Sequence, residues 1–210
     1  YARWVPQIVR DAGYDFETVG LFHVNNEYGA ATADGVEENA EANGFEVVDR
    51  LSYDSGTSNF NTQMQRMAEV DPDAIAVTTY GAAGEPLINS LNNVGWFPKF
   101  LTGPGSTALS TDSILEQMGE DANGAFHCSF GMNTSHPEYD GLNERYMERT
   151  GNNLTSNPMM AYIAADLILR AVERAGSADN DAVQQALANT NIEDPLIANS
   201  GPLRFDEDGE

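Results

Sequence analysis

The chain has very little positive charge and a single cysteine. Its 210 residues include one lysine, Lys99, and nine arginines against 33 acidic residues, which gives a formal net charge of −23. A surface of this charge repels the phosphates of nucleic acids and of anionic lipids, so neither is expected as a partner. Cys128 has no second cysteine to pair with, so no disulfide forms within the chain and the redox compartment stays undetermined.

The acidic residues are dispersed along the chain, and 41% of all residues are apolar. That combination is typical of a folded protein with an acidic surface and not of a disordered acidic tail. Because like charges at this density oppose compaction in dilute buffer, the surface suits a salt-rich medium that screens them. The sequence therefore predicts a halophilic source.

Membrane spans, secretion signals and common catalytic motifs are missing from the sequence. No apolar run has spanning length, and no signal-peptide pattern is present. There is no G-x-G-x-x-G, no G-x-x-x-x-G-K and no G-x-S-x-G. His23, His127 and His136 are scattered, without metal-ligand spacing to Cys128. We therefore expect no catalytic residue, no metal site and no cofactor, and we interpret His23 and His127 as core residues of buried strands.

Strand-like apolar runs alternate with helical patterns over the first 131 residues. The expected strands are 18–24, 45–51, 74–79, 99–102 and 124–130. The gaps between them hold an Ala- and Glu-rich helix at 30–43 and three further helices, which begin near Ser58, Pro86 and Thr111 or Asp112. Such alternation predicts an α/β fold with a doubly wound parallel sheet.

After Gly131 the alternation gives way to helices. We expect helices at 137–150, 158–175 and 179–189, and a short strand with a turn at 200–210. This change in pattern predicts two bodies, 1–131 and 132–199, with 200–210 returning to the first.

Small, polar or aromatic residues follow three of the expected strands. The carboxyl ends of parallel strands meet at one edge of the sheet, where open α/β sheets bind ligands. Three such segments at equivalent positions predict a ligand site. We call its six candidate residues the rim; they are Asn25, Tyr28, Thr79, Tyr80, Gly105 and Ser106.

Three segments together resemble the branched-chain amino acid (leucine/isoleucine/valine type) substrate-binding proteins of ABC importers. They are "VGLFHVNNEYGAATADGVEENAEANGFEVV", "DSGTSNFNTQMQRMAEVDPDAIAV" and "GPLRFDEDG". The resemblance implies a type I periplasmic-binding-protein fold, in which a ligand is held between two α/β lobes. It implies that 1–131 is the second lobe, that 132–199 are helices of an incomplete first lobe, and that 200–210 is a hinge strand. The chain is accordingly expected to be a fragment of a longer receptor.

The resemblance also implies roles for single residues. Tyr28 and Tyr80 match two tyrosines that face the ligand in the family's amino acid binders. Those binders place an acidic residue after the fourth strand to hold the ligand's ammonium group, and here the position falls on or beside Pro104. An amide, a carboxylic acid or another small polar solute is therefore an alternative to an α-amino acid.

The function that the resemblance implies is an extracellular solute receptor that delivers its ligand to a membrane permease. The full-length protein is expected at the cell surface, held by a lipid anchor or secreted. An enzyme or a ligand-sensing regulator built on the same fold is the alternative. The apolar stripe of the helix at 158–175, with Met160, Ile163, Leu167 and Val172, further predicts a homodimer formed through 132–199.

Overall fold

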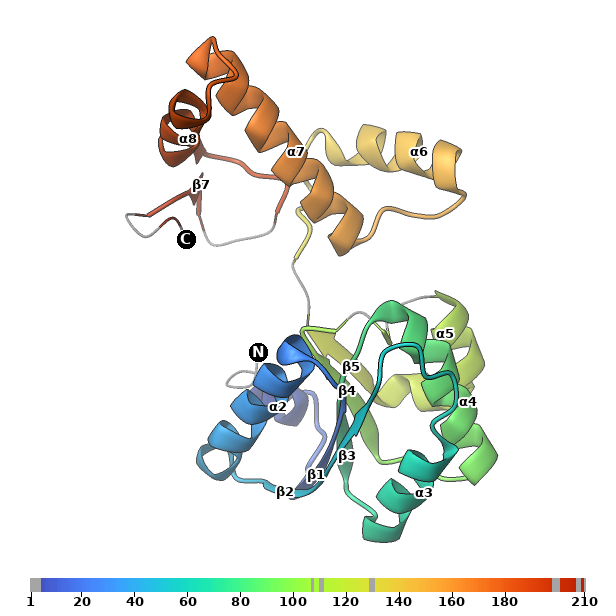
Figure 1. Cartoon of the computed structure of the whole chain (residues 1–210). Coiled ribbons are helices and arrows are strands. Elements are labelled where there is room, and N and C mark those ends of the chain that lie inside the picture. The colour runs from blue at the N-terminus through green and yellow to red at the C-terminus, as the bar shows by residue number, and fades with distance from the viewer. Residues whose placement is uncertain are drawn as a thin grey trace. The chain divides into compact units, whose positions relative to one another are not determined.

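The computed structural model describes residues 5–106, 108–109, 112–128, 131–197, 201–206 and 209. It contains two compact units, Tyr1–Ser129 and Phe130–Glu210, which we call unit 1 and unit 2 (Figure 1). Within the described residues, no helix has the length and apolar character needed to cross a membrane.

Unit 1 contains a five-stranded parallel sheet in the order β2-β1-β3-β4-β5. Its strands are β1 (Thr18–Val24), β2 (Glu46–Tyr53), β3 (Ala74–Thr78), β4 (Phe100–Pro104) and β5 (Ala125–Cys128). The strand order reverses direction next to β1, as in doubly wound folds, so the predicted fold class is confirmed.

Helices cover both faces of this sheet (Figure 1). They are α1 (Val5–Asp11), α2 (Glu27–Ala40), α3 (Asn61–Val70), α4 (Gly84–Val94) and α5 (Asp112–Met118), with 3₁₀ turns η1 (Glu41–Asn43), η2 (Gly81–Ala83) and η3 (Gly119–Gly124). One core lies under α1 and α2 and includes Val9, Leu21 and Ala33. The other lies under α3, α4 and α5 and includes Phe22, Met64 and Leu87. The alternation of Leu21 and Phe22 between the two cores follows from the two-residue period of a strand.

The starts of α2 and α3 differ from the sequence-based prediction. Helix α2 begins at Glu27 and not at Ala30, because the Asn26 side chain accepts a hydrogen bond from Gly29 N and caps the helix there. Tyr28 therefore lies in the first turn of a helix. Helix α3 begins at Asn61, and Ser58 does not cap it; its N-cap is Phe60, whose buried backbone N–H donates to Ser90 Oγ.

The last strand is shorter and more open than predicted. β5 ends at Cys128, and residues 129–130 lie outside the described part of the chain. The interpretation of His127 as a buried core residue is wrong, because its side chain is exposed. Among the described strands β5 pairs with β4 alone and lies at the edge of the sheet, so it is less covered than the central strands. His23, on the central strand β1, is buried as predicted.

The described residues of unit 2 form three helices and a pair of short antiparallel strands. They are α6 (Tyr139–Thr150), α7 (Ser156–Ala175), α8 (Asn180–Ala188), β6 (Asn191–Ile192) and β7 (Leu203–Arg204). Its core is a small cluster around four buried residues, Leu142, Leu154, Met159 and Ile163. The predicted short strand near the end is present as β7, which pairs antiparallel with β6. The expected assignment of the units to two lobes stays a prediction.

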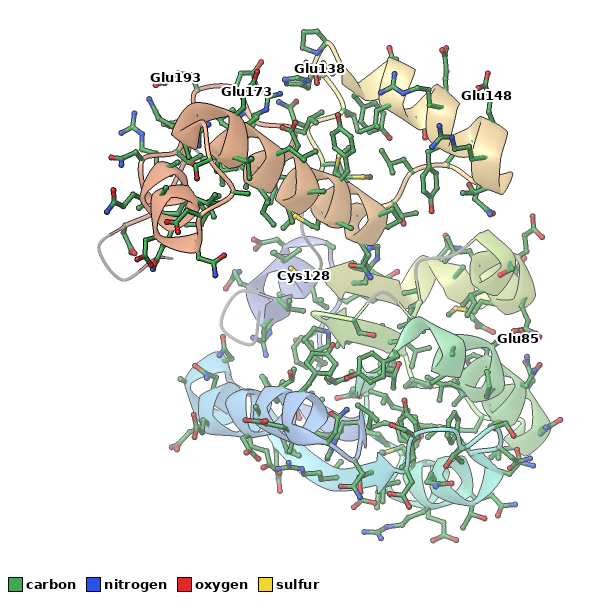
Figure 2. All side chains as sticks on the ribbon, turned by 45° about the horizontal axis from the view of Figure 1, so that its top comes forward. Glu85, Cys128, Glu138, Glu148, Glu173 and Glu193 are labelled. Atoms are coloured by element: carbon green, nitrogen blue, oxygen red, sulfur yellow. The ribbon has the colours of Figure 1, made fainter. Side chains whose placement is uncertain are left out.

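Acidic side chains are exposed in both units. Figure 2 labels four of them, Glu85 on α4, Glu138 and Glu148 at the start and near the end of α6, and Glu193 after β6. The acidic residues are thus spread over the surface as well as along the sequence.

Candidate functional site

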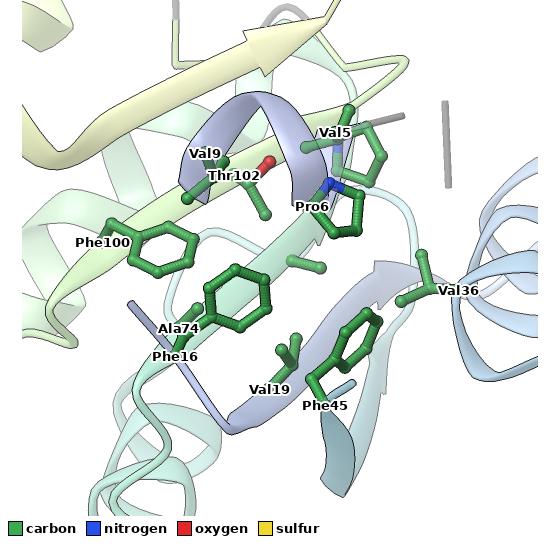
Figure 3. Close-up of a pocket in the computed structure, with 12 residues that line it drawn as sticks. Val5, Pro6, Val9, Phe16, Val19, Val36, Phe45, Ala74, Phe100 and Thr102 are labelled. Carbon is green, nitrogen blue, oxygen red and sulfur yellow. The ribbon is translucent and has the colours of Figure 1, made fainter. Parts of the chain in front are cut away.

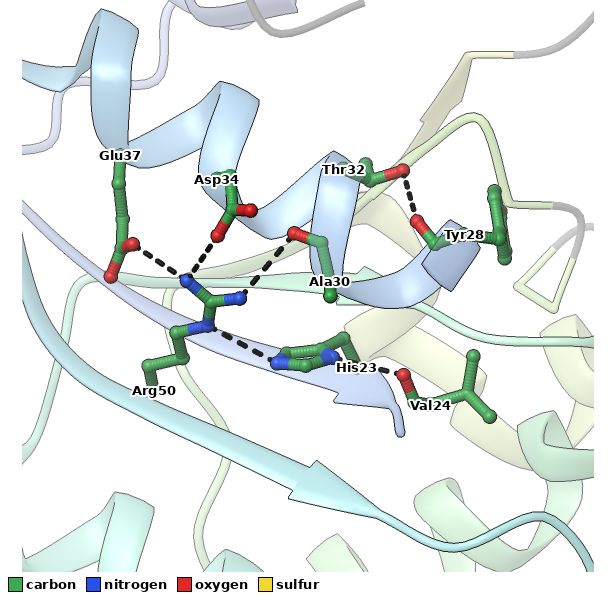
Figure 4. Close-up of polar contacts among 8 residues, drawn as sticks. All are labelled: His23, Val24, Tyr28, Ala30, Thr32, Asp34, Glu37 and Arg50. Carbon is green, nitrogen blue, oxygen red and sulfur yellow. Dashed lines mark hydrogen bonds and ion pairs between the residues drawn. The ribbon is translucent and has the colours of Figure 1, made fainter. Parts of the chain in front are cut away.

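The start of α2 places Tyr28 at the carboxyl edge of the sheet. β1 ends at Val24, two residues pass, and the helix begins at Glu27. A Cβ atom on Gly29 would lie 2.0 Å from the Val24 carbonyl oxygen, so only glycine allows the helix to start this close to the strand. Thr32 Oγ1 donates to the Tyr28 carbonyl oxygen at 2.9 Å and stabilises the first turn (Figure 4).

Tyr28 and Tyr80 lie side by side at this edge. Their ring centroids are 5.6 Å apart and the planes meet at 28°, which is a stacked arrangement. The Tyr28 hydroxyl donates to the carbonyl oxygen of Gly105 at 2.8 Å, so the ring spans from α2 to the loop after β4. Three segments that lie far apart in the sequence are thereby joined at one place, as the parallel topology predicts.

Asn26 links the helix cap to the tyrosine pair, and the sequence interpretation missed it. Its Oδ1 accepts from Gly29 N at 2.9 Å, and its Nδ2 donates to the Tyr80 hydroxyl oxygen at 3.0 Å. Tyr80 remains 51% exposed. An asparagine just before an expected helix is a capping signal, and that signal could have identified Asn26.

Ser106 and Thr79 form a buried hydrogen bond beneath the exposed residues of the rim. Ser106 Oγ donates to the Thr79 carbonyl oxygen at 2.8 Å, and both residues are buried. Gly105 has a φ of +70°, a conformation that favours glycine, and its N–H donates to Cys128 O at 3.0 Å. The first contact joins the ends of β3 and β4, and the second joins the end of β4 to the end of β5. The ligand-binding roles of Thr79, Gly105 and Ser106 stay predictions.

Asn25 lies at the outer side of the rim and is exposed. Its Nδ2 donates to Asp54 Oδ1 at 2.9 Å, and its N–H donates to the Tyr53 carbonyl oxygen at 2.7 Å. The side chain thus joins the end of β1 to the loop after β2. Its contact with a ligand stays a prediction.

Tyr53 is a third tyrosine at this edge, also missed by sequence reasoning. Its ring stacks on Phe22 at 5.1 Å and is almost fully buried. Burial raises the pKa of the Tyr53 hydroxyl, against the smaller opposing effect of a hydrogen bond from the Tyr80 backbone. A hollow of about 220 Å³ opens between Tyr53 and Tyr80; it is lined also by Ser55, Gly56, Thr57, Ser58, Ala82, Ala83 and Pro86. A small solute fits a hollow of this kind beside the exposed ring.

A polar cluster anchors α2 on the sheet next to the rim (Figure 4). Arg50 Nη1 lies 2.7 Å from both Asp34 Oδ1 and Glu37 Oε2. Burial alone would lower the pKa of Arg50, but the hydrogen bonds to these carboxylates raise it.

The same guanidinium fixes the tautomer of His23. Arg50 Nε donates to His23 Nε2 at 3.2 Å, so Nδ1 carries the proton and donates to the Val24 carbonyl oxygen at 2.9 Å. This network explains how a histidine is accommodated inside the sheet. It is structural, because its groups satisfy one another.

A cavity in the core of unit 1 is too small for a solute. The cavity in Figure 3 lies in the core under α1 and α2 and measures about 30 Å³, enough for about one water molecule. Thr102 is its one lining residue with a polar side chain, and Thr102 Oγ1 has no hydrogen-bond partner among the described residues. Across the described chain, no cluster of three or more histidine, cysteine, aspartate or glutamate side chains could hold a metal ion.

Comparison with known sequences identifies relatives over the whole chain. The family model described as "Periplasmic binding protein" matches residues 1–210. The Leu/Ile/Val-binding protein homolog 7 of Brucella abortus (strain 2308) is 24% identical over 210 residues, covering 98% of this chain and 52% of the relative. The homolog 8 of the same strain is 22% identical over 197 residues, covering 91% of this chain and 49% of the relative. The chain thus spans about half the length of the curated relatives it matches.

Solved structures share the fold. A leucine binding protein from Thermotoga maritima MSB8 superposes with a TM-score of 0.76 at 21% identity, covering 99% of this chain and 58% of that one. A solute binding protein of an ABC transporter from Rhodopseudomonas palustris BisB5, in complex with 3,4-dihydroxybenzoic acid, also gives 0.76, at 20% identity and with 99% and 56% covered. A fatty acid ABC transporter substrate-binding protein from Thermomonospora curvata gives 0.74 at 19% identity, with 97% and 54% covered. With its α/β fold and its match over the full 210 residues, the chain belongs to the periplasmic binding protein family.

Proposed function

We propose that this chain is part of the solute-binding receptor of an ABC importer and that its ligand binds at the rim. The stacked pair of Tyr28 and Tyr80 carries the proposal, because it joins three strand ends at the edge where α/β sheets bind ligands. The half-exposed ring of Tyr80 offers an apolar face and a hydroxyl to a small solute, and the adjoining hollow of about 220 Å³ gives it room. Relatives named for leucine, isoleucine and valine support an amino acid or related small solute.

The receptor does its work by binding and lobe closure, without chemical change of the ligand. Closure around a ligand is a hinge motion, and it requires a site that fits the ligand and forms hydrogen bonds with it. The rim is proposed to be that site. Asn25 and Gly105 are proposed to contact the ligand, and Thr79 and Ser106 to hold the rim and line its floor. An enzyme on the same fold would consume its solute, so recovery of the unchanged solute after incubation separates the two functions.

The test uses the full-length protein that contains this sequence. Mass spectrometry of the solute that co-purifies with it identifies the ligand, and calorimetry then measures the affinity. Tyr80→Ala is expected to weaken binding by about tenfold or more, because it removes both a stacking face and a hydrogen bond. Tyr162→Ala on α7, where the side chain is also partly exposed, is the matched control and should leave affinity unchanged. Equal affinity of Tyr80→Ala and the wild type would contradict the proposed site.

The proposed partner is the membrane permease of the importer, and the proposed location is outside the cell. Either a lipid anchor or secretion would place the receptor there. Protease treatment of intact cells should degrade the protein if it is exposed at the surface, and pull-down with the permease in the presence of ligand should recover it. Protection from protease in intact cells would contradict the location.

Self-association through residues 132–199 is a further proposal. The predicted stripe on α7 is partly covered, since Ile163 is buried and Leu167 packs against the core of unit 2. The most exposed large apolar residues on the helix are Ile168 and Leu169, at 52% and 68%, followed by Tyr162 at 37%. Light scattering of the 210-residue chain should show a dimer that Leu169→Glu dissociates. A wild-type chain that is monomeric at all concentrations would contradict the dimer.

The halophilic source is proposed from the net charge of −23 and the surface position of the acids. Raising sodium chloride from about 0.1 M to about 1 M shortens the screening length from about 10 Å to about 3 Å and should raise the melting temperature. Sodium sulfate serves as the comparison, because it also strengthens apolar burial. A melting temperature that falls with sodium chloride would contradict the proposal.

A further inference from the structure

Resting on the proposed function, we infer that Asn26 fixes the direction of the hydrogen bond that Tyr80 offers, so that the rim binds a ligand through an acceptor oxygen. The ligand group at Tyr80 is a carbonyl or a carboxylate, and not an ammonium group. Asn26 is a positioning residue in this inference, because it acts through Tyr80.

The orientation of the Asn26 amide is set by the helix start. The backbone N–H of Gly29 can only donate, so the atom of Asn26 that faces it at 2.9 Å must be the carbonyl oxygen. The NH₂ group therefore faces the Tyr80 hydroxyl, 3.0 Å away. Rotating the amide by half a turn would place two donors against each other at the N-cap and leave the start of α2 uncapped.

The amide in turn sets the role of the Tyr80 hydroxyl. An NH₂ group has no acceptor, so the Tyr80 oxygen must accept from it, and the hydroxyl proton is left to point elsewhere. Among the described residues, no acceptor takes that proton. Since Tyr80 is 51% exposed, the proton is available to a ligand.

The neighbouring tyrosine holds the donor in place. Tyr28 stacks on Tyr80 at 5.6 Å, and its own hydroxyl proton is used by the Gly105 carbonyl oxygen at 2.8 Å. Tyr80 thus presents one directed donor on a fixed ring. A carbonyl or carboxylate oxygen complements such a donor, whereas an ammonium group, which has no acceptor, does not.

One acidic group on the adjoining loop must be separated from this effect. Asp54 is exposed and accepts from Asn25 Nδ2 at 2.9 Å. A carboxylate there attracts a cation by charge alone. The experiment therefore compares a neutral amide, a carboxylate and an amine that carry the same 3-methylbutyl group.

The probes are 4-methylpentanamide, 4-methylpentanoate, isoamylamine and L-leucine, measured by calorimetry on the full-length protein that contains this sequence. Asn26→Asp keeps the N-cap but replaces the donor by an acceptor, so the Tyr80 proton turns toward residue 26. The amide probe, which carries no charge, should then bind about tenfold more weakly, the loss of about one hydrogen bond. In a Tyr80→Phe background, Asn26→Asp should change its affinity less than about twofold, because the coupled partner is gone.

Raman difference spectra against Tyr80→Phe provide a readout without a ligand. The intensity ratio of the tyrosine Fermi doublet differs between a phenol that accepts and one that donates, and Asn26→Asp should switch it. Thermal unfolding of the same variants should be unchanged, because the cap is retained.

Four results would overturn the inference. The first is an unchanged doublet ratio in Asn26→Asp. The second is that Asn26→Asp weakens amide binding equally in the wild-type and the Tyr80→Phe backgrounds. The third and fourth are that the wild type binds isoamylamine more strongly than the amide, or binds no probe at all. The proposed receptor function is judged separately, by the co-purifying solute and by Tyr80→Ala. If those two tests succeed and Asn26→Asp has no effect on binding, the receptor function is retained and the inference about Asn26 is wrong.

Discussion

Unit 1 has a sheet with helices on both faces, whereas unit 2 has helices and one short hairpin. Leu21 and Phe22 of unit 1, neighbours on one strand, are both almost fully buried, because each face of the sheet is covered. In unit 2 the longest helix, α7, buries Met159 and Ile163 but leaves Ile168 and Leu169 open. A layered architecture buries both faces of a central strand, while a helix without a sheet buries one stripe.

The two units also use charge differently. In unit 1, Arg50 contacts Asp34, Glu37, His23 and the Ala30 carbonyl, and so connects β2 with β1 and α2. In unit 2, Arg170 pairs with Asp166 one turn away on the same helix. Arg50 therefore connects three elements of unit 1, whereas Arg170 connects two residues of one helix; a second ion pair in unit 2, Arg204 with Glu193 at 3.5 Å, lies at the β6–β7 pair.

The largest expected effect is in the core of unit 1. Phe22→Ala should lower the free energy of unfolding of unit 1 by about 3–5 kcal/mol, because it leaves a cavity between Tyr53 and Phe60. Urea unfolding followed by hydrogen exchange of the β1 amides measures it. Leu169→Ala in unit 2 is the control and should change the stability by less than about 0.5 kcal/mol. Similar losses in both would show that the two units do not differ in burial.

A smaller loss is expected at the start of α2. Gly29→Ala places a Cβ against the Val24 carbonyl oxygen and should destabilise unit 1 by about 2 kcal/mol or more. Solute binding should weaken with it, because Tyr28 is the preceding residue. Gly81→Ala meets nothing within 4 Å and is the matched control. An unchanged melting temperature in Gly29→Ala would mean that the helix start can shift without cost.

The two arginines should differ when each is replaced by methionine. Arg50→Met removes several charge-assisted contacts and should cost about 1.5–3 kcal/mol. Arg170→Met removes one exposed pair within a helix and should cost about 0.5 kcal/mol or less. Chemical denaturation of the two variants under identical salt measures both. Equal costs would contradict the difference in how the units use charge.

The smallest expected effect is a loss of stability at low pH. Burial alone would raise the pKa of Asp73, but hydrogen bonds from Lys99 and from the backbone N–H groups of Glu17 and Thr18 outweigh it and hold the pKa at about 2. The ordinary value is 3.8, so Asp73 stabilises unit 1 fully above pH 4 and loses this contribution as the pH falls toward 2.

The expected loss is about 1 kcal/mol, after allowance for solvent screening. Unfolding at a series of pH values measures it. Asp73→Asn is the control; its stability should lack this component between pH 4 and pH 2. Identical acid profiles for wild type and Asp73→Asn would contradict the assignment.

The sequence by itself determined the alternation of strands and helices, the parallel sheet and the gathering of Tyr28 and Tyr80 at one edge. These follow from periodicity and from the geometry of parallel strands, which are local or topological properties. It did not determine that α2 starts at Glu27, since that depends on how closely Gly29 can approach Val24. Nor did it show that His127 is exposed, because exposure depends on β5 being the edge strand.

Only the tertiary structure decided the chemistry at the rim. The hydrogen-bond direction at Tyr80 depends on Asn26, which lies 54 residues away in the sequence, and on a helix cap that fixes the amide. Likewise, Tyr53 and the hollow beside it arise from the end of β2 meeting the loop after β3. Sequence patterns report which face of an element is apolar, but the partner of a polar group is set by distances between elements, and those exist only in the folded chain.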